Sequence, residues 1–243
     1  MQLTQTTTGS GPRRVGLVHG LGASAATWRP FIERLAATGR YTVTTVDLRG
    51  HGESPRADSY TVDDMATDLV ESMPSGLDSI VGHSLGGAVL YRAAARLAPG
   101  RAVYLDPGFA LPLPTSGLAG RLFWMVPLVS LGFAQLGQAR ASAAARAAYS
   151  PETRALLDDA KKHFDARMAV GVFRDVAFRP VAVEAPAVPS TLVLSDQSTA
   201  VLPDPLVTRL EQHGWQVRRI PGVSHDMQLE DPDSTFTAVE DVL

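Results

Sequence analysis

Cysteine is absent from this chain of 243 residues. Its absence excludes disulfide bonds, thiolate metal ligands and a cysteine nucleophile. It is also consistent with a reducing compartment, so we expect a cytoplasmic protein. A strong excess of one charge is lacking too, because 22 basic and 25 acidic residues leave a formal net charge of −3. Such a small charge creates no field that recruits nucleic acid or an anionic membrane, and we expect neither as a partner.

Long hydrophobic runs are also lacking. The most apolar segment, residues 122–136, is shorter than the roughly 20 apolar residues that a helix needs to cross a bilayer, and Pro127 and Gly132 interrupt it. We therefore expect no stable membrane insertion and interpret this segment as a buried or cleft-lining helix. Residues 1–12 carry no basic stretch followed by an apolar one, so we expect no secretory signal.

Short apolar runs that suit β-strands alternate with stretches of helical pattern. The runs are residues 15–18, 41–46, 79–81, 102–105, 191–194 and 216–220, and the helical stretches are about 28–38, 62–72, 85–97, 205–213 and 233–243. This alternation predicts an α/β fold, in which helices cover both faces of a mostly parallel central sheet. Near-continuous apolar runs are expected for strands that are buried on both faces.

The alternation stops in residues 108–189, where no strand is expected. A proline-rich entry, the apolar segment, an alanine-rich run over 139–148 and a mixed helix over about 151–172 take its place. A long insertion without strands is more typical of a functional lid than of a loop. We predict a core of residues 1–107 and 190–243, with a helical cap over the carboxyl ends of the strands. The alternative is a helical subdomain that packs elsewhere.

Ser84 lies at the centre of a G-x-S-x-G pattern, between an apolar run and a helical stretch. A sharp strand-to-helix turn of this kind holds the serine backbone in a strained conformation and exposes its Oγ above the sheet. Gly82 and Gly86 are needed because neighbouring backbones approach too closely there for side chains. The pattern predicts that Ser84 is a nucleophile.

Four segments, taken in order along the chain, resemble the α/β-hydrolase superfamily. They are Val18-His19-Gly20-Leu21-Gly22, the stretch from Asp47 to Ser54, the Ser84 turn, and Gly222-Val223-Ser224-His225. The resemblance implies a serine hydrolase, similar to esterases and lipases, that uses no metal or organic cofactor. It assigns His225 as the general base, a role that suits an imidazole because its pKa lies near working pH.

Acyl transfer builds negative charge on a carbonyl oxygen, and two backbone N–H groups must already point at that oxygen. One donor is the amide of Leu85, the residue after the nucleophile. The resemblance implies that the other donor is Leu21, which makes His19 a turn residue rather than a catalyst. The remaining histidines are interpreted as ordinary core or surface residues: His51, His83, His163 and His213.

The acid that would orient His225 is less clear. In the superfamily it usually follows a late strand, but here that position falls on Ser198 or Thr199, which carry no charge. Asp106 and Asp196 are the two replacements, and each lies at the end of an apolar run. We favour Asp106 because its Asp-Pro-Gly sequence begins a turn, and we keep Asp196 as the alternative. Either would hold the imidazole tautomer and stabilise the imidazolium.

These residues predict an enzyme that hydrolyses a carboxylic ester or lactone of a small to medium apolar substrate through an acyl-enzyme. Epoxide hydrolases and haloalkane dehalogenases need a carboxylate in the strand-to-helix turn where this chain has Ser84, so Ser84 argues against both. Carbon–carbon bond hydrolases and lyases with this fold retain the serine and histidine, and they remain an alternative. A ligand-binding sensor that kept the fold and lost the chemistry is another.

Overall fold

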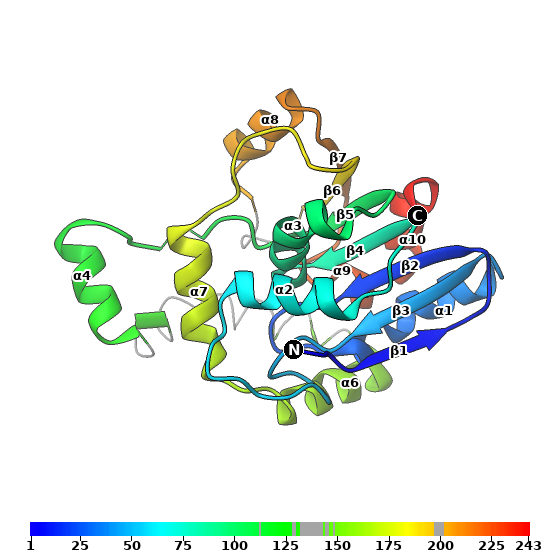
Figure 1. Ribbon diagram of the computed structural model, residues 1–243, viewed down its shortest axis with the longest axis horizontal. Coiled ribbons are helices and arrows are strands. Elements are labelled where there is room, and N and C mark those ends of the chain that lie inside the picture. Colours follow the sequence, from blue (N-terminus) through cyan, green and yellow to red (C-terminus); the bar gives the residue numbers. More distant parts are fainter. Residues whose placement is uncertain (112, 128–129, 132–142, 144–145, 148, 197–201) are drawn as a thin grey trace.

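A seven-stranded sheet forms the centre of the molecule, in the order β1-β3-β2-β4-β5-β6-β7 (Figure 1). The computed structural model describes residues 1–111, 113–127, 130, 131, 143, 146, 147, 149–196 and 202–243. The strands are β1 (Gln5–Thr8), β2 (Arg13–Val18), β3 (Tyr41–Val46), β4 (Ser79–His83), β5 (Arg101–Leu105), β6 (Ser190–Ser195) and β7 (Gln216–Ile220). Strands β2 to β7 are parallel, and β1 pairs antiparallel with β3 at the edge. The mostly parallel α/β fold is therefore confirmed, and the six apolar runs are its parallel strands.

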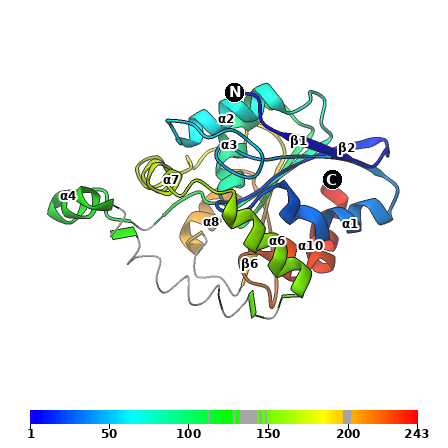
Figure 2. The ribbon, with the colours of Figure 1, turned by 90° about the horizontal axis from the view of Figure 1, so that it is seen from below.

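Helices cover both faces of the sheet. One face carries α2 (Val62–Ser72), α3 (Leu85–Leu97) and α8 (Asp204–Gln212), and the other carries α1 (Arg29–Ala37), α9 (Met227–Glu230) and α10 (Pro232–Val239). Figure 2 shows α2 and α3 on the opposite side of the sheet from α1 and α10. Each of the five expected helical stretches corresponds to one of these helices.

Alternate residues of the same strand fill the two cores. In β4, Ile80 packs with α2 and α3, whereas its neighbour Val81 packs with α1 and α10. In β6, Leu192 lies in the same core as Ile80 and Val193 in the same core as Val81, and all four side chains are fully buried. The period-2 geometry of a strand sends successive side chains to opposite faces, so a sheet covered on both sides needs continuous apolar runs.

The described part of residues 108–189 contains α4 (Gly117–Met125), α6 (Pro151–Lys162) and α7 (Met168–Phe178), and no strand. Helix α7 lies beyond the carboxyl ends of the parallel strands, and α4 projects furthest from the sheet (Figure 1). Ser150 explains the start of α6, because its Oγ accepts a hydrogen bond from the backbone N–H of Thr153 at 3.1 Å.

The expectation of a single helix over residues 151–172 is wrong, because residues 163–167 separate α6 from α7. Asp165 explains the interruption. Its backbone N–H donates to the carbonyl of Gly50 at 2.9 Å, and its carboxylate accepts from the Tyr60 hydroxyl at 2.7 Å. The adjacent Arg167 guanidinium holds the pKa of Asp165 below its usual range. These contacts tie the segment that joins α6 to α7 to the core.

The apolar segment also differs from expectation. Its described part includes the end of α4, where the side chains of Leu122 and Met125 are 56% and 75% exposed. The prediction of a buried or cleft-lining helix is therefore wrong for these residues, because α4 projects away from the sheet. Most of the alanine-rich run over 139–148 lies outside the described residues. Among the helices that the structure describes, none is both long and apolar enough to cross a membrane.

Replacing Asp165 by alanine should lower the free energy of unfolding by about 2 to 4 kcal/mol, because the buried Tyr60 hydroxyl loses its acceptor. Asp159→Ala is the matched control, since its side chain on α6 is 64% exposed. The control should change stability by less than about 0.5 kcal/mol. Urea unfolding measures both variants, and equal effects would contradict the role given to Asp165.

Candidate active site

Ser84 lies in the tight turn between β4 and α3, with φ 51° and ψ −115°. A non-glycine residue rarely adopts this conformation, and the surrounding packing holds it there. A Cβ on Gly82 would come within 2.6 Å of the Gly86 carbonyl oxygen, and one on Gly86 within 2.3 Å of the Val18 carbonyl oxygen. The two glycines therefore allow the start of α3 to approach the end of β2, as the G-x-S-x-G pattern predicts.

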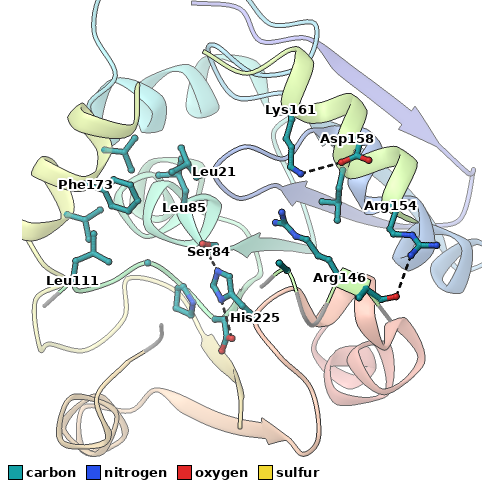
Figure 3. A pocket seen from close by; sticks show the side chains of 18 residues that line it. Leu21, Ser84, Leu85, Leu111, Arg146, Arg154, Asp158, Lys161, Phe173 and His225 are labelled. Carbon is teal, nitrogen blue, oxygen red and sulfur yellow. Dashed lines mark hydrogen bonds and ion pairs between the residues drawn. The ribbon is translucent and has the colours of Figure 1, made fainter. Parts of the chain in front are cut away.

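His225 lies beside Ser84 in the loop that joins β7 to α9 (Figure 3), and its ring contacts both Ser84 and Asp106. Its Nε2 is 2.9 Å from the Ser84 Oγ, and its Nδ1 is 3.3 Å from the Asp106 Oδ2. With a proton on Nδ1, the ring donates to the carboxylate and accepts from the hydroxyl. The structure thus brings together a hydroxyl, an imidazole and a carboxylate from three separate loops.

Asp106 is almost fully buried at the end of β5 and has a positive φ of 39°. Its Oδ1 accepts from the backbone N–H of Ser195 at 2.8 Å, and its Oδ2 accepts from the Ser195 hydroxyl at 2.5 Å. These two bonds fix the carboxylate in the plane from which it reaches His225. Sequence reasoning missed Ser195, although a serine at the tip of the adjacent strand β6 was a signal that it could contact Asp106.

Asp196, the alternative acid, makes a different contact. Its Oδ1 accepts from the backbone N–H of Gly222 at 2.8 Å, so it stabilises the turn that precedes His225 instead of binding the imidazole. Of the two candidates, only Asp106 has a carboxylate oxygen beside the His225 ring. Ser198 and Thr199, the positions where the superfamily usually carries its acid, lie outside the described residues.

The loop after β2 lies against Ser84. A Cβ on Gly20 would be 3.1 Å from the Ser84 Cβ, and Leu21 and Leu85 both line the cavity above the serine. Within the described part of the chain, neither of these leucine amides donates to a protein acceptor. The two N–H groups are therefore available to a substrate oxygen next to Ser84.

Two buried histidines hold this loop in place. The neutral ring of His51 accepts from the backbone N–H of Gly22 at 3.0 Å, and that of His19 accepts from the backbone N–H of Leu48 at 3.0 Å. Burial lowers the pKa of His19, and burial together with the neighbouring His19 lowers the pKa of His51 to about 3. Both rings therefore stay neutral and keep a nitrogen free to accept, as expected of structural histidines.

The ring of His83 binds the backbone carbonyl of His225 and not the His225 imidazole. The Nε2–H of His83 donates to the carbonyl oxygen of His225 at 2.9 Å. Burial and the nearby His225 lower the pKa of His83 to about 4, so this ring is neutral. Sequence reasoning treated His83 as an ordinary core residue and did not detect that it supports the loop of His225.

A cavity of about 720 Å³ opens above Ser84. Leu111 and Phe173 lie on one side of the serine, and the charged side chains of Arg146, Arg154, Asp158 and Lys161 lie on the other (Figure 3). The cavity is large enough for a small organic substrate. Among the described residues, no group of three or more histidine or carboxylate side chains is placed to hold a metal ion.

The model of the alpha/beta hydrolase family matches residues 17–238. The chain belongs to this family. A pimeloyl-[acyl-carrier protein] methyl ester esterase of Methylococcus capsulatus is 40% identical over 100 residues, which are 41% of this chain and 37% of that relative. The alignment thus spans well under half of the relative's length.

Solved hydrolases share the fold over almost the whole chain. An enol-lactonase from Burkholderia xenovorans has a TM-score of 0.74 at 21% identity, covering 99% of this chain and 95% of its own. An epoxide hydrolase from Bacillus megaterium has a TM-score of 0.76 at 15% identity, covering 99% and 96%. Identities this low show the fold alone, so the chemistry of this hydrolase has to be argued from its own residues.

Opposing effects set the pKa of His225. Burial lowers it, but the hydrogen bond that the ring donates to Asp106 and the negative charges of Asp226 and Asp106 outweigh burial, and the pKa lies above its ordinary value. The positive charge of Arg146 acts in the opposite direction. The protonated form of His225 is therefore stabilised by its surroundings.

Asp226→Asn should lower the pKa of His225, because the substitution removes a negative charge that favours the imidazolium. Titration of the histidine ring protons by NMR measures this shift. Asp233→Asn, on the exposed surface of α10, is the control and should leave the pKa unchanged. An unchanged or higher pKa in Asp226→Asn would contradict the electrostatic account of the site.

Proposed function

We propose that this protein is a serine hydrolase that cleaves a carboxylic ester or lactone through an acyl-enzyme intermediate. The observation that carries the proposal is the pair of contacts of His225, at 2.9 Å from the Ser84 Oγ and 3.3 Å from the Asp106 Oδ2. A base between a hydroxyl and a buried carboxylate is the arrangement that activates a serine. The esterase and lactonase names of relatives with the same fold support this choice of substrate class.

In the first half of the reaction, the Ser84 Oγ attacks the ester carbonyl carbon while its proton moves to the Nε2 of His225. The carbonyl π electrons move to oxygen, and the amides of Leu21 and Leu85 donate to the resulting oxyanion. Asp106 stabilises the imidazolium and does not take the proton. The carbonyl then re-forms, the bond to the alcohol oxygen breaks, and His225 returns its proton to that leaving group.

In the second half, water attacks the acyl group on Ser84, and His225 again serves as the base. Collapse of this second tetrahedral intermediate breaks the bond to the Ser84 Oγ, which recovers its proton from His225. The products are a carboxylic acid and an alcohol, or a hydroxy acid when the substrate is a lactone. The enzyme returns to its starting state, so one catalytic cycle consumes one water molecule.

The same proposal assigns different roles to the core and to the cap. Residues 1–107 and 190–243 form the core that carries the catalytic residues, and residues 108–189 form a cap that encloses the substrate. Leu111, Val172 and Phe173, which belong to that cap, line the cavity with apolar side chains. An apolar wall favours the hydrocarbon part of an ester over water.

Carbon–carbon bond hydrolases and lyases are the alternative enzymes with the same fold, and a ligand-binding sensor is the non-catalytic alternative. A sensor has no need for a hydroxyl held 2.9 Å from an imidazole, or for two free amides beside it. A carbon–carbon bond hydrolase or lyase needs an acid or base for a carbanion. Besides the three proposed catalytic residues, the titratable side chains among the described residues that line the cavity are Arg146, Arg154, Lys161 and Asp158, and the carboxylate of Asp158 is already paired with Lys161 at 3.3 Å.

Ser84→Ala and His225→Ala should each lower kcat/KM for p-nitrophenyl esters by at least about four orders of magnitude, because each removes one half of the nucleophile–base pair. The assay is a chain-length series of esters, with thermal unfolding as the check that both variants fold. Substantial residual activity in Ser84→Ala would overturn the assignment of the nucleophile.

Asp106→Asn and Asp196→Asn separate the two candidate acids. Asp106→Asn should lower kcat by about three to four orders of magnitude, because the amide no longer stabilises the imidazolium or fixes its tautomer. Asp196→Asn keeps an oxygen that accepts from the Gly222 N–H, and it should change kcat less than about twofold. A larger loss in Asp196→Asn than in Asp106→Asn would show that the acid is misassigned.

A further inference from the structure

Three cationic side chains line the cavity above Ser84. Lys161 and Arg154 come from α6, and Arg146 comes from the residues before it. Figure 3 shows the Lys161 and Arg146 side chains directed toward the serine from the α6 side, whereas Leu111 and Phe173 lie on the opposite side. The cavity thus has an apolar wall and, opposite it, a wall with these three cations and the Asp158 carboxylate, here called the cationic wall, with Ser84 between the two.

The acidic residues nearby do not balance these cations. Lys161 pairs with Asp158 at 3.3 Å, and Arg146 pairs with Asp226 at 3.6 Å. Arg154 donates to the carbonyl of Ala147 at 3.4 Å, and no carboxylate of the described residues lies within 4 Å of it. The residues outside the described part of the chain include no aspartate or glutamate. The cationic wall therefore retains an excess of one positive charge.

The cap as a whole carries the same imbalance. Residues 108–189 contain nine basic and six acidic residues, although the complete chain is negative by three charges. Residues 108–189 are thus net positive by three charges, and three of their nine basic residues line the cavity above Ser84. Like charges held near one another in a cavity repel, and an anionic ligand removes that repulsion.

We propose that Arg146, Arg154 and Lys161 bind a carboxylate of the substrate, so that the preferred substrate is an ester whose acyl chain ends in a second, ionised carboxyl group. The single excess charge matches a singly charged carboxylate better than a phosphate, which carries about two charges near neutral pH. A guanidinium binds a carboxylate through two parallel hydrogen bonds, and such charge-assisted bonds are the stronger ones. This inference rests on the proposed ester hydrolysis at Ser84.

Two neighbouring lysines make a matched pair for testing the proposal. Lys161 and Lys162 both lie in the last turn of α6, and each pairs with an aspartate three residues earlier, at 3.3 and 3.5 Å. Only Lys161 lines the cavity. Neutralising either lysine changes the net charge by the same amount. A difference in substrate preference between the two variants therefore comes from the charge inside the cavity and not from the net charge of the molecule.

The experiment compares monomethyl adipate with methyl hexanoate, which has the same acyl chain without the terminal carboxylate. The wild type should favour the adipate monoester by about tenfold or more in kcat/KM, followed in a pH-stat at low ionic strength. Lys161→Gln and Arg154→Gln should each reduce this ratio by about three- to tenfold, mainly through KM, and Lys162→Gln should leave it unchanged. Asp158→Asn, which removes a competing carboxylate, should increase it.

Equal turnover of the two esters by the wild type would overturn the carboxylate site and leave the serine hydrolase intact. Equal effects of Lys161→Gln and Lys162→Gln would also overturn it. If neither ester is turned over, the proposed ester hydrolysis fails, and the carboxylate site is then tested on its own. The test is calorimetric measurement of ligand binding to Ser84→Ala. Monomethyl adipate should bind this variant about tenfold more weakly after the additional change Lys161→Gln but not after Lys162→Gln. Equal binding would contradict the carboxylate site independently of catalysis.

Discussion

The close approach of α3 to the end of β2 is the constraint on which the rest of the site depends. Gly86 packs so tightly against the backbone of β2 that a Cβ would lie 2.3 Å from the Val18 carbonyl oxygen. This contact holds Ser84 at a positive φ and places the loop of Leu21 beside it. A looser turn would separate the serine from the loop amides, so the packing of two glycine-containing segments determines where charge can be stabilised.

The features that sequence predicted well are those that short segments encode. The apolar runs identified the parallel strands, and local motifs singled out Ser84 and His225, which the structure places 2.9 Å apart. The acid was harder, because the position of Asp106 depends on Ser195 at the tip of a strand that is distant in sequence. The support that His83 gives the loop of His225 was missed for the same reason, since it runs to a backbone carbonyl. Contacts of this kind join residues that are distant in sequence, so no local motif marks them.

In residues 108–189, too, contacts between distant residues limited what the sequence could predict. Helical periodicity suggested one helix over residues 151–172, but tertiary hydrogen bonds of Asp165 separate two helices. The hydrophobicity of α4 suggested burial, but its position away from the sheet leaves Leu122 and Met125 exposed. In our account the core supplies a general mechanism for acyl transfer. The cap supplies selectivity, through an apolar wall on one side of Ser84 and a cationic wall on the other.

The central claim is that Ser84 is a nucleophile activated by His225. The most direct measurement is the reaction of the intact protein with a fluorophosphonate, followed by mass spectrometry of the adduct and of its peptides. The account predicts one adduct per chain, located on Ser84, that forms rapidly in the wild type and far more slowly in His225→Ala. An unmodified wild-type protein, or an adduct on a different residue, would contradict it.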